Sequence, residues 1–359
     1  MKVHRKSCGC DDNTCCTCAP KKSHGKCGSR HCNVRKSPYF VEICRPASDV
    51  HPGYVGNTGH SPKMGAHGDG DGDNSACDTR DCGLQIHVVD SGPKKGPVVV
   101  FLRCVGFAAP EQFQYQHEAL SAQGFRVLTI DLPGIGESDK PYIDYDLDIW
   151  ADYLRDILDE LDLCNITLVG VSAFRSIVAR YASRHKCHRL CRIVFMSITT
   201  SGANPPSPFG LPPAVLDQFT EQARAGGVQA LFAQFIPGFY APEAIPQPTY
   251  DWLFQGAVTT PVRTMIAFFQ EILKSDITQD LRRLCVPTLV IQGENDVLNP
   301  LPATLAALPL IPDGQLITFP TGHAVFLIDP IGFSNAIADF ARDCKPSKSR
   351  KDCVKRCER

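Results

Sequence analysis

From residue 83 onward the chain alternates short apolar runs with amphipathic helical stretches, and this alternation restricts its fold more than any other feature. The apolar runs predict strands at 83–92, 96–102, 125–130, 166–170, 192–196, 287–293 and 315–319. The stretches between them predict helices at 111–123, 146–162, 173–185, 301–308 and 331–343. This order predicts an α/β fold, with a mostly parallel, doubly wound sheet that binds its ligands at the carboxyl ends of the strands.

One interval interrupts the alternation, because residues 197–286 are too many for a single crossover helix. We expect several inserted helices here, forming a lid at about residues 200–280. The interval is rich in aromatic side chains, namely Phe209, Phe219, Phe232, Phe235, Phe239, Tyr240, Trp252, Phe254, Phe268 and Phe269. We expect most of them to pack the helices together, and the alternative is that some roof an apolar pocket over the strand ends.

Cysteine is unusually frequent, and ten of the 18 cysteines precede residue 83. The thiols in "CGCDDNTCCTC" (8–18) and "CGSRHC" (27–32) could bind zinc or copper(I), although their spacing matches no standard zinc module. Residues 1–82 show no sustained helical or strand period. We therefore expect a disordered, Cys-rich N-terminal extension at 1–82, with weak metal binding as the alternative, before a folded domain at 83–343.

The overall charge excludes some classes of partner. A formal net charge of -1 and a pI near 6.8 predict no general attraction to nucleic acid or to an anionic membrane. No apolar run is long enough for a membrane span, and the first residues lack a signal-peptide core. We expect a cytoplasmic protein without stable membrane association, in which thiols stay reduced and disulfides are not favoured. The basic tail at 344–359 is expected to be solvated, with an anionic partner or an acylated cysteine as the alternative.

Three residues that follow predicted strands have the side chains of a nucleophilic site. They are Ser172 in "LVGVSAFRS", Asp296 in "QGENDVLNP" and His323 in "PTGHAVFLIDP". A serine hydroxyl becomes a good nucleophile when an imidazole takes its proton, and a carboxylate holds that imidazole in the correct tautomer. The order Ser, Asp, His along the chain is that of the α/β-hydrolases.

From about Gly83 to Ala341 the sequence resembles the α/β-hydrolase superfamily, in its branch of esterases and cofactor-free haloperoxidases. The matching segments are "IDLPGIGESDKP" (130–141), "SDITQDLRRLCVPTLVIQGENDVLNP" (275–300) and "PTGHAVFLIDPIGF" (320–333). The resemblance implies Ser172 as nucleophile, Asp296 as acid and His323 as base, with the backbone N–H groups of Val105 and Ala173 holding the oxyanion. It implies a small-molecule ester or acyl substrate, no cofactor and no metal, and peroxide as a possible replacement for water.

The sequence departs from the family pattern at two places. In "FLRCVGF", Arg103 and Cys104 replace His-Gly, which adds a side chain beside the oxyanion site and a cation that needs a carboxylate or water. In "GVSAFRS", Phe174 stands where the G-x-S-x-G pattern has glycine. Two functions remain open: a working serine esterase with altered packing, or a catalytically impaired α/β-hydrolase-fold protein that binds a small molecule or a partner.

Overall fold

The computed structural model describes residues 40–44, 82–105, 112–203, 207–210 and 212–344. The predictions for the N-terminal extension, apart from its short segment at 40–44, and for the tail at 345–359 lie outside these residues. Within them, no group of three or more His, Cys, Asp or Glu side chains could hold a metal ion.

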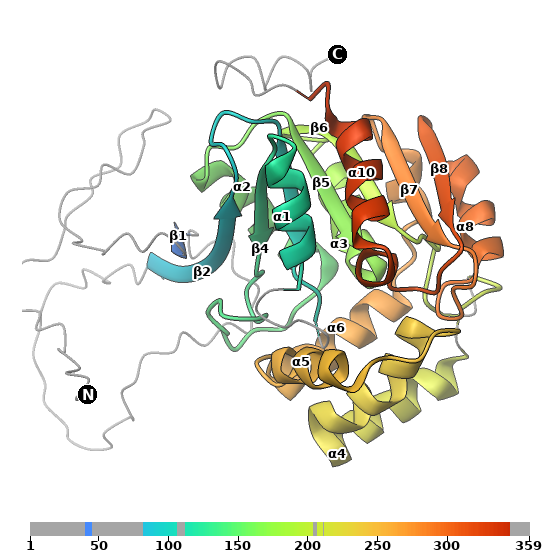
Figure 1. The fold of residues 1–359 in the computed structure, drawn as a ribbon. Helices are drawn as coiled ribbons and strands as arrows, with labels where there is room; N and C mark the ends of the chain where they lie inside the picture. Colours follow the sequence, from blue (N-terminus) through green and yellow to red (C-terminus); the bar gives the residue numbers. More distant parts are fainter. Residues whose placement is uncertain (1–39, 45–81, 106–111, 204–206, 211, 345–359) are drawn as a thin grey trace, which may run out of the picture. The chain divides into compact units, whose positions relative to one another are not determined.

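An eight-stranded sheet forms the centre of the fold, with the strand order β1-β2-β4-β3-β5-β6-β7-β8. The strands are β1 (Phe40–Cys44), β2 (Cys82–Ser91), β3 (Val98–Leu102), β4 (Arg126–Ile130), β5 (Ile166–Val171), β6 (Leu190–Met196), β7 (Thr288–Gly293) and β8 (Gly314–Phe319). β2 pairs antiparallel with β1 and with β4, and the other neighbours are parallel. The predicted mostly parallel sheet is therefore confirmed (Figure 1).

Helices cover both faces of the sheet. α1 (Gln114–Ala122) packs against α10 (Pro330–Ala341) in front of the sheet in Figure 1, and α2 (Leu147–Glu160) packs against α3 (Arg175–Arg184). Every residue of β3, β5 and β7 is buried, as expected for central strands that are covered on both faces. All the predicted strands and helices outside the lid are present, with ends within a few residues of their predicted positions.

One strand was not expected. The sequence analysis found no strand before residue 83, but Phe40–Cys44 forms β1 and pairs with β2 from Phe40 opposite His87 onward. This segment, "FVEIC", is only five residues long and lies within a polar region, so its alternation is too short to predict a strand by itself.

The interval after β6 contains the inserted helices that the sequence predicted. They are α4 (Pro213–Tyr240), α5 (Gln247–Ala257) and α6 (Val262–Lys274), which lie together below the sheet in Figure 1. α4 is interrupted at Gly227, whose φ of 62° belongs to the left-handed region. The shorter helices α7 (Thr278–Arg282), α8 (Leu301–Ala307) and α9 (Val325–Ile328) complete the domain.

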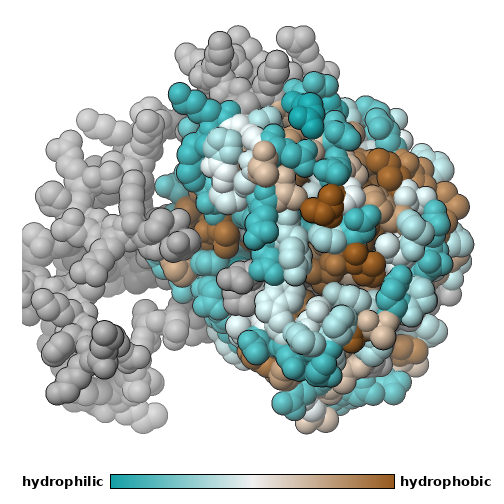
Figure 2. Space-filling view, in the orientation of Figure 1, coloured by the Kyte–Doolittle hydropathy of each residue, from teal (hydrophilic) through white to brown (hydrophobic). Residues whose placement is uncertain are grey.

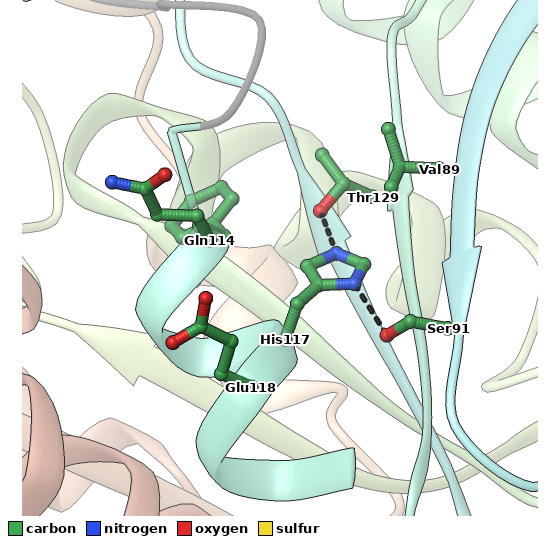
Figure 3. Close-up of a pocket in the computed structure, with 7 residues that line it drawn as sticks. Val89, Ser91, Gln114, His117, Glu118 and Thr129 are labelled. Carbon is green, nitrogen blue, oxygen red and sulfur yellow. Dashed lines mark hydrogen bonds between the residues drawn. The ribbon is translucent and has the colours of Figure 1, made fainter.

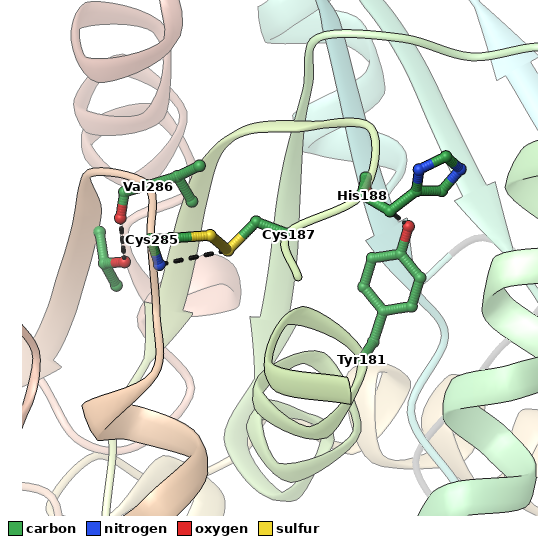
Figure 4. The surroundings of a disulfide bond; sticks show 6 residues. Tyr181, Cys187, His188, Cys285 and Val286 are labelled. Carbon is green, nitrogen blue, oxygen red and sulfur yellow. Dashed lines mark hydrogen bonds between the residues drawn. A yellow bond between two sulfur atoms is a disulfide. The ribbon is translucent and has the colours of Figure 1, made fainter. Parts of the chain in front are cut away.

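Two disulfide bonds lie within the described residues, Cys187–Cys285 and Cys191–Cys344. Cys187 lies just before β6 and Cys285 just before β7, where the backbone N–H of Cys285 also donates to Cys187 Sγ at 3.2 Å (Figure 4). The expectation that the cysteines stay reduced is therefore wrong for these four residues.

The described surface is mixed in character. Hydrophilic and hydrophobic residues are intermixed over the face shown in Figure 2. In the described part of the chain, no helix combines the length and the apolar composition that a membrane crossing requires.

The Cys187–Cys285 bond should stabilise the domain, because it links residues 98 positions apart and so restricts the unfolded chain. We expect the double variant Cys187→Ser/Cys285→Ser to lose roughly 2–4 kcal/mol of unfolding free energy, measured by denaturant titration with circular dichroism. The control is the same titration in dithiothreitol, where the parent and the variant should converge. Equal stability of the two proteins without reductant would contradict the prediction.

Candidate active site

Ser172 occupies the sharp turn between β5 and α3. Its φ of 53° lies in the left-handed region, which is unfavourable for a side chain with a Cβ. Gly170 permits this turn, because a Cβ at that position would lie only 3.0 Å from Arg175 Cα at the start of α3. This strand, turn and helix are the geometry in which α/β-hydrolases expose a nucleophilic serine.

The structure brings the three sequence-predicted polar residues together. His323 Nε2 lies 2.8 Å from Ser172 Oγ, and His323 Nδ1 lies 2.7 Å from Asp296 Oδ2. Asp296 follows β7 and His323 follows β8, so each residue comes from the carboxyl end of a different strand. The side chains of Asp296 and His323 are fully buried, which shields their contact from water.

Asp296 is held as a carboxylate. Burial alone would raise its pKa, but the nearby His323 and the N–H groups of Asn299 and Leu298 outweigh burial, so the pKa of Asp296 is lowered. Both N–H groups donate to Oδ1 at 2.8 Å. Because an ionised Asp296 only accepts hydrogen bonds, His323 Nδ1 carries the proton and Nε2 accepts from the Ser172 hydroxyl.

The two predicted oxyanion donors lie at the same cavity as Ser172. Val105 follows β3, Ala173 follows Ser172, and both line this cavity. Next to Val105, the backbone N–H of Cys104 donates to Gln112 Oε1 at 3.0 Å.

The Arg103 cation points to a carboxylate rather than to Ser172. Arg103 is buried, does not line the cavity, and its Nε donates to Asp131 Oδ1. Asp131 Oδ2 also accepts from the backbone N–H of Glu137 at 2.9 Å and lies 3.0 Å from His87 Nδ1. The expectation that Arg103 needs a carboxylate or water is therefore confirmed, and the carboxylate is Asp131.

Cys104 occupies the position beside the oxyanion donors without adding charge. Burial raises the pKa of its thiol to about 12, so the group is neutral at physiological pH. Its Sγ lies 3.9 Å from the carbonyl oxygen of Val171, at the end of β5. Cys104 also lines the cavity, so it narrows the space beside Ser172 but leaves it open.

Phe174 fits the turn because its backbone does not need glycine. Its φ of −67° and ψ of −14° are right-handed helical values, and the unfavourable conformation falls on Ser172 instead. The Phe174 ring stacks on Phe268 of the lid helix α6, with ring centroids 4.8 Å apart. The large side chain therefore forms part of the cavity wall, in contact with the lid.

The cavity has a volume of about 360 Å³ and a mostly apolar lining, rich in phenylalanine. Its aromatic lining residues from the lid interval are Phe209, Phe219, Phe235, Phe239, Phe268 and Phe269. These are six of the ten aromatics noted in the sequence, so the alternative that some of them border an apolar pocket applies as well. The expected helix packing is also present, for example in the ring contacts Phe219–Phe235 and Phe235–Phe269. The Phe239 ring meets His323 edge to face at 4.8 Å.

A second serine–histidine pair lies elsewhere, in a cavity of about 340 Å³ between α1, β2 and β4 (Figure 3). His117 Nδ1 lies 2.7 Å from Ser91 Oγ, and its Nε2 lies 2.8 Å from Thr129 Oγ1. Burial lowers the pKa of His117 to about 4, so the ring is neutral. Because hydroxyls occupy both ring nitrogens, no carboxylate orients this histidine as Asp296 orients His323.

Two further residues of the site were not found from the sequence. Gln292 donates through Nε2 to Asp296 Oδ2 at 3.3 Å and to Asn299 O at 3.0 Å, which supports the loop that carries the acid. Arg175 lines the cavity and is only 4% exposed. Both are polar residues next to apolar stretches, in "TLVIQG" and "SAFRSIV". A polar side chain beside such a stretch is the sequence feature that could have identified them as site residues.

The chain is similar to proteins of a known family. The family model described as alpha/beta hydrolase fold matches residues 97–330. The non-heme chloroperoxidase CPO-A1 of Kitasatospora aureofaciens is 29% identical over 74% of this chain and 98% of its own length. The bifunctional esterase/perhydrolase DCH of Acinetobacter calcoaceticus is 28% identical over 66% of this chain and 88% of its own.

A solved structure gives the same result. The crystal structure of the bromoperoxidase from Bacillus anthracis superimposes with a TM-score of 0.68 at 25% identity, covering 73% of this chain and 96% of that one. The chain is a hydrolase-type enzyme and belongs to the α/β-hydrolase family, in the branch that contains esterases and non-heme haloperoxidases.

Proposed function

We propose that the protein is a serine hydrolase that cleaves small carboxylic esters through Ser172, His323 and Asp296. The observation that carries this proposal is the continuous hydrogen-bonded path from Ser172 Oγ to His323 Nε2 at 2.8 Å and from His323 Nδ1 to Asp296 Oδ2 at 2.7 Å. A nucleophile, a base and an orienting carboxylate in this geometry are the components of acyl transfer.

In the proposed reaction, His323 Nε2 takes the proton of Ser172 as Oγ attacks the ester carbonyl. The N–H groups of Val105 and Ala173 donate to the resulting oxyanion, a contribution worth several kcal/mol in enzymes of this kind. Collapse of the intermediate breaks the ester bond, and His323 returns the proton to the departing alcohol. A water molecule, activated by His323, then attacks the acyl group on Ser172 and releases the acid.

Peroxide is a second acceptor in this scheme. Hydrogen peroxide can attack the acyl group on Ser172 in place of water, giving a peracid and free enzyme without any redox change at the protein. The names of the Acinetobacter relative, an esterase/perhydrolase, and of the chloroperoxidase relative support this side activity.

The alternative, a binding protein with an impaired site, rests on Arg103, Cys104 and Phe174. Each of these side chains has a place that spares the catalytic geometry: Arg103 pairs with Asp131, Cys104 lies against Val171, and Phe174 stacks on Phe268. Their presence therefore gives little support for loss of turnover.

Labelling at the serine tests the proposed nucleophile. We expect a fluorophosphonate probe to label the protein at Ser172, because His323 activates that hydroxyl. Peptide mass spectrometry identifies the modified residue, and Ser172→Ala is the control that should not be labelled. A folded parent protein that remains unlabelled would overturn the proposal.

The variant Asp296→Asn should retain folding but lose on the order of 10⁴-fold in kcat, because His323 then adopts the wrong tautomer.

A Phe174→Gly variant distinguishes the two functions. We expect the parent to hydrolyse p-nitrophenyl butyrate and the variant to be no faster, because the Phe174 ring stacks on Phe268 in the wall of the cavity that Ser172 also lines. The variant should also lose roughly 3–5 kcal/mol of unfolding free energy, the usual cost of removing a buried phenyl ring. Phe174→Leu serves as the control that keeps most of the apolar volume. Esterase activity that arises only in Phe174→Gly would show that the ring closes the site, and would favour the binding protein.

A further inference from the structure

Arg175 places a buried positive charge in the wall of the active-site cavity. It is the first residue of α3, three positions after Ser172, and lines the same cavity as that serine. The side chain is 4% exposed, and its Nε donates one long hydrogen bond, to Thr199 O at 3.5 Å. Across the described ranges of the chain, no carboxylate forms an ion pair with Arg175.

The closest negative charge is already engaged. Asp296 raises the pKa of Arg175, but burial outweighs this effect and lowers the pKa to about 10, so the guanidinium remains charged at neutral pH. Both oxygens of Asp296 are occupied, Oδ1 by the N–H groups of Leu298 and Asn299 and Oδ2 by His323. A buried cation without a hydrogen-bonded counter-ion is unfavourable, and a bound anion would relieve this.

Other buried arginines of the domain have such a partner. Arg103 pairs with Asp131, and Arg189, with a side chain 2% exposed, pairs with Asp159. Neither of these arginines lines the cavity that contains Ser172. Arg175 therefore differs from them in both respects, since it faces a space that a ligand can fill and has no carboxylate of its own.

We propose that the substrate is an ester that carries a free carboxylate, and that Arg175 is the counter-ion for this carboxylate. The inference rests on the proposed esterase function and names its substrate class. A guanidinium can bind a carboxylate through two parallel hydrogen bonds, which fixes orientation as well as position. Ser201 and Asn299 add polar groups to the same cavity, while the phenylalanines of the lid contact the apolar part of the substrate.

The position of Arg175 makes it a specificity-determining residue. Ser172 lies in the turn that leads into α3, and Arg175 is the first residue of that helix, so a carboxylate bound at Arg175 holds the rest of a short substrate near Ser172. The chemical steps at Ser172 and His323 are those of the proposed esterase reaction. The bound carboxylate gives the buried guanidinium a counter-ion.

The test compares pairs of methyl esters that have the same carbon chain between the ester and its end group and differ in the charge of that end group. Monomethyl succinate, glutarate and adipate are each measured against methyl butyrate, pentanoate and hexanoate, in which a methyl group replaces the carboxylate. We expect kcat/KM of the parent to be roughly ten-fold or more higher for at least one charged ester than for its neutral match. In Arg175→Met this ratio should fall to about one, whereas Arg175→Lys, which keeps the charge, should retain part of it. A parent ratio at or below one for all three pairs overturns the proposal, even if Arg175→Met fails to fold.

A binding measurement separates this proposal from the esterase function. In the non-hydrolysing Ser172→Ala background, calorimetry should detect the charged ester more tightly bound than the neutral one, and Arg175→Met should abolish the difference. Hydrolysis of both esters with equal efficiency and equal binding overturns the carboxylate site and leaves the esterase intact. Arg175-dependent binding by a protein that hydrolyses neither ester and resists the fluorophosphonate overturns the esterase and retains the anion site.

Discussion

The left-handed backbone at Ser172 is the constraint on which the site depends. β5 and α3 approach so closely at Gly170 that a methyl group there would contact the first residue of the helix. The chain can make this approach only by turning sharply, and Ser172 takes the unfavourable φ of 53°. That one turn places the serine hydroxyl 2.8 Å from His323 Nε2, and it brings Ala173 and Arg175, the first residue of α3, to the wall of the same cavity.

The charged side chains near the turn at Ser172 are held by other groups of the protein. Asp296 is ionised, and backbone donors and His323 satisfy it, so its carboxylate needs no water. Arg103, directly before Cys104 and Val105, forms a separate buried pair with Asp131. Fixed dipoles and charges of this kind cost no reorganisation during a reaction. Arg175 is the exception, because its positive charge has no ion-pair partner among the described residues and its proposed partner is the carboxylate of the substrate.

The sequence predicted the parallel sheet and the three polar residues because both depend on local patterns. Apolar runs such as those of β3 and β5 mark buried strands, and Ser172, Asp296 and His323 each follow such a run. The pairing of Cys187 with Cys285, the direction of the Phe174 ring and the pairing of β1 with β2 could not be read in this way. Each depends on a contact between segments far apart in the chain, and periodicity within one segment carries no information about such contacts.

The stacking of Phe174 on Phe268 joins the turn at Ser172 to the inserted helix α6. One ring is fixed two positions after Ser172 on the rigid sheet scaffold, and the other belongs to helix α6. A displacement of α6 away from the sheet would separate these two rings and expose their stacked faces to water. The opening of the cavity and the exclusion of water from the surroundings of Ser172 are therefore coupled, because both depend on the contact between these two rings.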